Sequence, residues 1–139
     1  MSEKLSHIRK EIYRKIAGFF PDIKDKENCS RIDLKAEGIN DIYALKLDRK
    51  DGNIDLILAN FTDREYKVSD PEYKILVNPD REEAQVISFT NPSYSKVVYP
   101  VYAEIPQEVQ DHYNKSLSTW LDSLKTKGYI SSTGPSQSL

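Results

Sequence analysis

The chain of 139 residues has little of the chemistry on which most enzymes depend: one cysteine, two histidines and five glycines. The single cysteine, Cys29, excludes an internal disulfide and a cysteine-based zinc site. Its solitary state fits a reducing compartment and predicts a cytoplasmic protein. The glycines are scattered along the chain, which excludes a phosphate-binding loop and a dinucleotide-binding fingerprint.

Long apolar runs and an excess of either charge are also missing. The N-terminal segment is charged from Glu3 onward and lacks the apolar core of a signal peptide. No run approaches the roughly 20 apolar residues that span a bilayer. The 20 basic and 22 acidic residues nearly cancel, so a domain-wide basic field for nucleic-acid binding is excluded. We therefore expect neither a membrane segment nor a strong nucleic-acid signal.

The few chemically versatile side chains do not form a catalytic or metal-binding pattern. His7 and His112 lie on two predicted helices far apart in the sequence, so they make no local metal-binding pair. His112 follows Glu108 by four residues, a spacing typical of pairs on a helix surface. No nucleophile elbow of the G-x-S-x-G type occurs. The sequence therefore favours a non-enzymatic protein, and we predict no catalytic residue, no metal and no cofactor.

Two segments have the apolar periodicity of amphipathic helices. The first covers residues 2–20 and ends before Pro21, which cannot continue a helix. The second covers residues 106–127, with Pro106 suited to the first helical turn. The apolar stripes that predict these helices are Leu5, Ile8, Ile12, Tyr13, Ile16, Phe19 and Phe20, and Val109, Tyr113, Leu117, Trp120, Leu121 and Leu124.

Five segments between the helices have the alternating pattern of strands, at residues 32–36, 43–47, 54–61, 73–77 and 84–89. Asp51-Gly52 predicts a hairpin turn, and Asn78-Pro79-Asp80 predicts another. Residues 62–72 are polar and contain Pro71, so we expect a connecting loop there. Residues 97–102 are β-prone, but Pro100 limits them to an edge strand or an extended loop.

These elements predict an α+β fold. An antiparallel sheet of five strands, or six, carries the N-terminal and C-terminal helices packed on one face. The strand at residues 54–61 is apolar on both faces, which indicates a central position. Residues 1–130 form a single domain, and residues 131–139, small and polar, are expected to be a disordered tail.

Tyrosines provide the first candidate site. Tyr94, Tyr99 and Tyr102 cluster after the last predicted hairpin, near Lys96. Such a cluster could stack nucleic-acid bases, meet another protein, or simply pack over the sheet edge. A pocket between the sheet and the helices is a separate candidate, with Asp80, Tyr99 and His112 as its binding residues.

The second half of the chain resembles the YqiB-like bacterial proteins, a family of unknown function. The similarity lies in the hairpin of residues 73–86, in the Tyr99-Pro100 step and in the Trp-Leu pair of the helix at residues 114–121. Pro79 stands where the family usually has a histidine, so any role of that histidine is missing here. The resemblance implies a compact bacterial cytoplasmic domain and no particular activity.

Three functions remain as hypotheses. The leading one is a protein-interaction or adaptor module that meets another protein near Tyr94 and Tyr102. The first alternative is a secretion-chaperone-like dimer, although such chaperones place a helix where residues 62–72 look too polar. The second alternative is a small-molecule-binding protein.

Overall fold

The computed structural model describes residues 3–63, 68–92, 94–97 and 106–131. Helix α1 covers Glu3–Phe19 and helix α2 covers Gln107–Thr126, which confirms both predicted helices. A short 3-10 helix, η1, follows at Ile23–Asp25. Within these ranges, no helix is long and apolar enough to cross a membrane.

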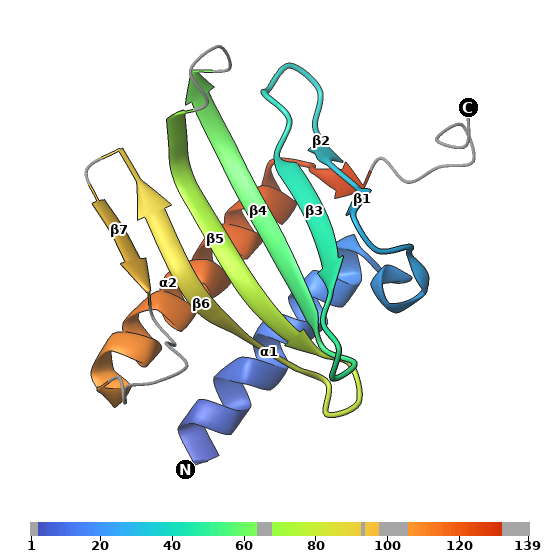
Figure 1. Ribbon diagram of the computed structural model, residues 1–139. Coiled ribbons are helices and arrows are strands. Elements are labelled where there is room, and N and C mark those ends of the chain that lie inside the picture. Colours follow the sequence, from blue (N-terminus) through green and yellow to red (C-terminus); the bar gives the residue numbers. More distant parts are fainter. Residues whose placement is uncertain (1–2, 64–67, 93, 98–105, 132–139) are drawn as a thin grey trace.

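An antiparallel six-stranded sheet forms the body of the protein (Figure 1), and it confirms the predicted α+β class. The strands lie in the order β1, β3, β4, β5, β6, β7, so β4 is central as expected. Their bounds are Ser30–Arg31, Tyr43–Asp48, Ile54–Asp63, Val68–Asn78, Glu83–Asn91 and Tyr94–Val97. Two further short strands, β2 at Leu34–Lys35 and β8 at Ile130–Ser131, pair with each other.

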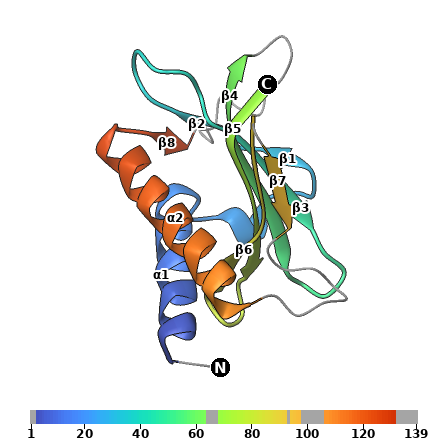
Figure 2. The ribbon, with the colours of Figure 1, turned by 90° about the vertical axis from the view of Figure 1, so that its left-hand side faces the viewer.

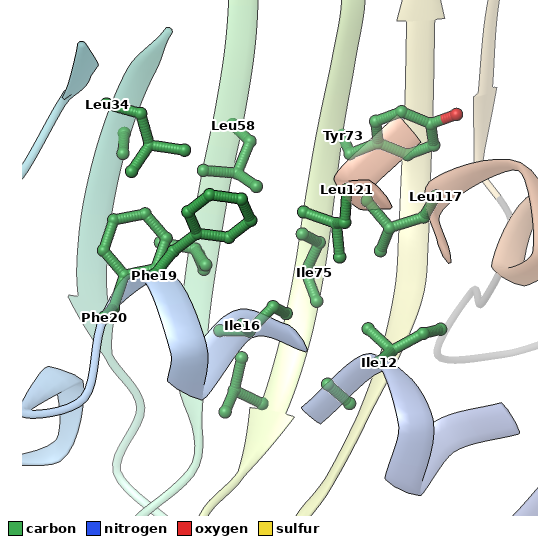
Figure 3. Close-up of a cluster of buried hydrophobic side chains, with 14 of the residues drawn as sticks. Ile12, Ile16, Phe19, Phe20, Leu34, Leu58, Tyr73, Ile75, Leu117 and Leu121 are labelled. Carbon is green, nitrogen blue, oxygen red and sulfur yellow. The ribbon is translucent and has the colours of Figure 1, made fainter. Parts of the chain in front are cut away.

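Both helices cover the same face of the sheet, and they run side by side in the same direction (Figures 1 and 2). The hydrophobic core lies in this layer, because the helix stripes and the inward side chains of β4 and β5 meet there (Figure 3). The largest fully buried apolar side chains are Ile12, Ile16, Phe20, Leu34, Leu56, Leu58, Tyr73, Ile75, Leu117, Leu121 and Leu124.

A polar contact joins α2 to the sheet inside this core. Asn114 is buried, and its Oδ1 accepts a hydrogen bond of 2.8 Å from the backbone N–H of Val86. Val86 lies beside a register irregularity, since Ile75 pairs with Val86 while Lys74 pairs with Ser88. The amide of Asn114 thus satisfies a backbone donor that is buried at this bulge.

The predicted loop at residues 62–72 is wrong at both ends, because β4 runs to Asp63 and β5 begins at Val68. Pro71 lies within β5, where the pairing between β4 and β5 shifts register. A bulge of this kind tolerates proline because the missing N–H has no regular partner there. Asn60 supports the irregular stretch by donating from Nδ2 to the Asp70 carbonyl at 2.9 Å.

The predicted strand at residues 32–36 is reduced to the two-residue strand β2, which pairs with β8, while the preceding strand β1 pairs with β3 in the large sheet. Asp33 lies between them, and its Oδ1 accepts a hydrogen bond of 3.0 Å from the Ala44 N–H. The sixth strand is β7, which starts three residues before the predicted one and shares only Val97 with it. Ser131, expected in the tail, pairs with Leu34 in the small sheet.

In strand β3 a small and a charged side chain face the core, and the large apolar side chains lie on the other face of the sheet. Ala44 and Lys46 are buried beneath the helices, whereas Tyr43, Leu45 and Leu47 are half-buried on the other face of the sheet. Lys46 can be buried because its ammonium group donates to the backbone carbonyls of Lys24 and Lys26, in the segment after α1.

Candidate functional site

Of the three residues predicted to bind a ligand in a pocket, the structure describes Asp80 and His112. Asp80 is exposed in the turn between β5 and β6, and it borders a hollow of about 420 Å³ with His7 and Arg14. His112 is exposed on α2 and does not border that hollow. Tyr94 begins the edge strand β7, while Tyr99 and Tyr102 lie outside the described residues.

The hollow at Asp80 has mixed charge. Arg81 and Lys10 both reach Glu83, at 3.9 Å and 3.8 Å, and Lys10 also donates to the Arg81 carbonyl at 3.1 Å. Asp80 and Glu82 are exposed acids on the same rim as Arg14 and His7. All the residues that line this hollow are polar or charged, so it lacks the apolar surface typical of a ligand site and is a weak candidate.

A larger groove lies on the outer side of the two helices, between the C-terminal halves of α1 and α2 and the start of β8. We call it the helix groove, and its volume is about 630 Å³. Its residues come from Glu11 to Phe19 of α1, from Leu121 to Lys125 of α2, and from the segment Gly128 to Ser131. This volume lies within the range of about 300–1,000 Å³ that is usual for ligand sites.

The floor of the helix groove is apolar. Phe19, Leu121 and Tyr129 line it, and each side chain is largely buried in the core below. The Tyr129 hydroxyl turns away to donate to the Asn40 carbonyl at 2.6 Å. Burial raises the pKa of Tyr129, and the nearby Asp41 carboxylate raises it further, so this tyrosine is neutral at physiological pH.

Glycines at two places keep the groove open. Gly18 is an exposed residue in the last turn of α1, and a Cβ placed there would meet no atom within 4 Å. Gly128 has φ +87° and ends α2, with its N–H bonded to the Lys125 carbonyl and the Tyr129 N–H bonded to the Leu124 carbonyl. This is the Schellman arrangement, which turns the chain sharply and leads it into β8.

One lysine fixes the spacing of the two groove walls. Lys15 of α1 donates from Nζ to Ser118 Oγ at 2.6 Å and to Asp122 Oδ2 at 3.0 Å, both on α2. It also forms an ion pair with Glu11 at 3.7 Å. The carboxylates of the groove, Glu11 and Asp122, are therefore both engaged by the same cation.

Two other cations on the walls have no such partner. Arg14 of α1 and Lys125 of α2 are exposed, and within the described part of the chain neither makes an ion pair or a side-chain hydrogen bond. The groove is lined by three basic side chains and two acidic ones, so its net charge is +1. The basic residues are Arg14, Lys15 and Lys125, and the acidic ones are Glu11 and Asp122. The arrangement can attract an anionic group to an apolar floor.

An exposed apolar side chain stands on the rim. Ile130 lines the groove and is 69% exposed, and among the residues that the structure describes only Ile39 is another exposed large hydrophobic residue. Its neighbour Tyr129, which directly precedes β8, is buried. The apolar surface thus continues from the floor of the groove over its edge.

Sequence reasoning missed the helix groove. One available signal was Gly18, a glycine inside a strongly patterned helix where alanine is the better helix former. Another was Ile130, an apolar residue directly after the predicted end of the helix. Among residues 3–63, 68–92, 94–97 and 106–131, no group of three or more His, Cys, Asp or Glu side chains is placed to hold a metal ion.

No protein-family model matches the chain, and no curated protein and no solved structure is significantly similar to it. The interpretation of the site therefore depends on its own geometry.

Proposed function

We propose that this domain is a protein-interaction module that receives a segment of another protein in the helix groove. The observation that carries the proposal is the combination of an apolar floor with two exposed cations, Arg14 and Lys125, that have no partner among the described residues. Aromatic and aliphatic floors with polar rims are typical of surfaces that bind proteins. Because Lys15 engages both carboxylates of the groove, the lining favours binding over proton transfer.

A small-molecule site is the second candidate, since the volume of the groove also suits a compact ligand. Ile130 favours the protein partner. A small ligand seated on the floor would leave this 69% exposed side chain in water, whereas a protein segment that crosses the rim would cover it. The tyrosine surface around Tyr94 stays a prediction, as does the similarity to the YqiB-like family.

Site-specific photocrosslinking in the native host cell tests the proposal. A photoreactive amino acid replaces Ile130 on the groove rim, Lys74 on the opposite face of the sheet, or Tyr94 on the edge strand. We expect a crosslink to one partner protein from position 130 and none from position 74. A partner that crosslinks from position 94 alone would support the tyrosine surface instead.

Gly18 supplies the matched controls. Gly18→Leu places a side chain in the groove without a clash, because the space beside its Cα is open. We expect this change to abolish the crosslink from position 130, while Gly18→Ala, which adds only one methyl group, retains it. A crosslink that survives Gly18→Leu would show that the partner does not occupy the groove. Thermal stabilisation by a metabolite, lost in Gly18→Leu with no crosslink at any position, would establish the small-molecule alternative.

A further inference from the structure

We infer that the segment bound in the helix groove is acidic and amphipathic, with apolar side chains directed at the floor and carboxylates directed at Arg14 and Lys125. This inference rests on the proposed function and adds the chemistry of the partner. It follows from the placement of charge relative to apolar surface on the lining.

The cations stand on opposite walls of the groove. Arg14 belongs to α1 and Lys125 to α2, and the apolar floor residues Phe19 and Leu121 come from the same two helices. A segment that crosses the groove from one wall to the other passes both cations. Arginine also suits carboxylates because its planar fork binds both oxygens at once.

The acids of the lining do not reverse this preference. Asp122 and Glu11 are held by Lys15 at 3.0 Å and 3.7 Å, so their charge is locally compensated. A basic segment would have to displace Lys15 from these contacts and would face Arg14 and Lys125 as like charges, which is unfavourable. An acidic segment leaves the Lys15 network in place.

The floor and rim call for apolar anchors on the same segment. Phe19 and Leu121 form the floor, and Ile130 continues the apolar surface over the edge. A helix that carries apolar residues three and four positions apart presents one such stripe, with acids beside it. The expected partner is therefore an acidic amphipathic helix.

A peptide selection tests this chemistry directly. A displayed library of random peptides of about 15 residues, enough for four helical turns, is selected on the intact domain and counter-selected on Gly18→Leu. We expect the groove-dependent peptides to carry apolar residues at helical spacing and an excess of Asp and Glu. Binding of one selected peptide is then measured by fluorescence anisotropy.

Charge variants give the quantitative outcome. Arg14→Glu combined with Lys125→Glu should weaken the selected peptide on the order of tenfold or more, because two attractions become repulsions. The same peptide with its acids changed to lysine should bind the double variant better than the original domain. The neutral pair Arg14→Gln and Lys125→Gln should lie between them, and melting curves verify that each variant is folded.

The possible failures are distinct. Groove-dependent peptides that are neutral or basic would overturn the inferred chemistry and leave the proposed function standing. Acidic peptides whose affinity ignores the charge variants would also overturn it. A selection that yields no peptide dependent on Gly18 would count against a protein segment in the groove, and the inference would fall with the proposed function.

Discussion

Lys46 lies on β3 beneath the helices, and its ammonium group holds the segment that follows α1. The side chain is only 1% exposed, yet Nζ donates to the backbone carbonyls of Lys24 and Lys26 and forms an ion pair with Asp48 at 3.1 Å. A lysine is tolerated at such depth because each of its donors finds a partner. The residue thus joins the chain around η1 to the sheet.

Replacing Lys46 with methionine should lower the free energy of unfolding by about 1–3 kcal/mol, since the loop carbonyls lose their donor while the apolar volume is kept. Urea denaturation measures the change, and hydrogen exchange should quicken in residues 21–29. Asp48→Asn is the matched control. The Asp48 carboxylate is half-exposed, so the loss of its charge should lower the free energy of unfolding by about 1 kcal/mol or less. If Lys46→Met left the free energy of unfolding unchanged, water would have to replace the ammonium group as the donor to the loop carbonyls.

The same residue shows a limit of sequence analysis at this scale. Alternation alone favours Tyr43, Leu45 and Leu47 as the core face of β3, because a lone lysine between apolar residues normally marks the solvent side. The true orientation depends on carbonyls about 20 residues earlier in the chain. A local sequence pattern does not contain tertiary partners of this kind. The burial of Lys46 was therefore not predictable, nor was the absence of a partner for Arg14 among the described residues.

Among the helices and strands, the structure confirms both predicted helices and both predicted hairpins. These elements were predictable because a 3.6-residue apolar period and turn residues are local signals. The end of β4 at Asp63 and the start of β5 at Val68, both within the predicted loop of residues 62–72, were not predicted. Polar residues and Pro71 normally end a strand, but here the register shifts accommodate them. The helix groove depends on how two distant helix ends meet, which no single element encodes.

Two glycines at the helix ends should respond in opposite directions to the same substitution. Gly18→Ala should raise the free energy of unfolding by about 0.5–1 kcal/mol, because alanine restricts the unfolded chain and meets open space in the helix. Gly128→Ala should lower it by about 1–2 kcal/mol, since φ +87° is strained for a residue with a Cβ. Urea unfolding of the two variants side by side measures both values. Equal signs would contradict the assigned roles.

At the scale of the whole molecule, the sheet has two unequal faces. The face toward the helices contains the core, including the fully buried Leu56. The opposite face is apolar in part, with Tyr43, Leu45 and Ile57 half-buried, and no helix among the described residues lies over it (Figure 2). The proposed partner site is on the outer side of the helices, so binding and this second sheet face are separated by the core.

This separation predicts different responses at two leucines on the two faces. Leu56→Ala should lower the free energy of unfolding by about 2–5 kcal/mol, because it leaves a cavity in a packed layer. Leu45→Ala should cost about 1 kcal/mol, the usual effect at a partly exposed position. Urea denaturation of both variants gives the comparison.

Partner binding gives the second readout for Leu45→Ala. The crosslink from position 130 should persist at its original strength, because the sheet and the core lie between Leu45 and the helix groove. If Leu45→Ala abolished that crosslink while the protein remained folded, the partner would have to reach the second sheet face as well. The helix groove would then be one part of a surface that wraps around the edge of the domain.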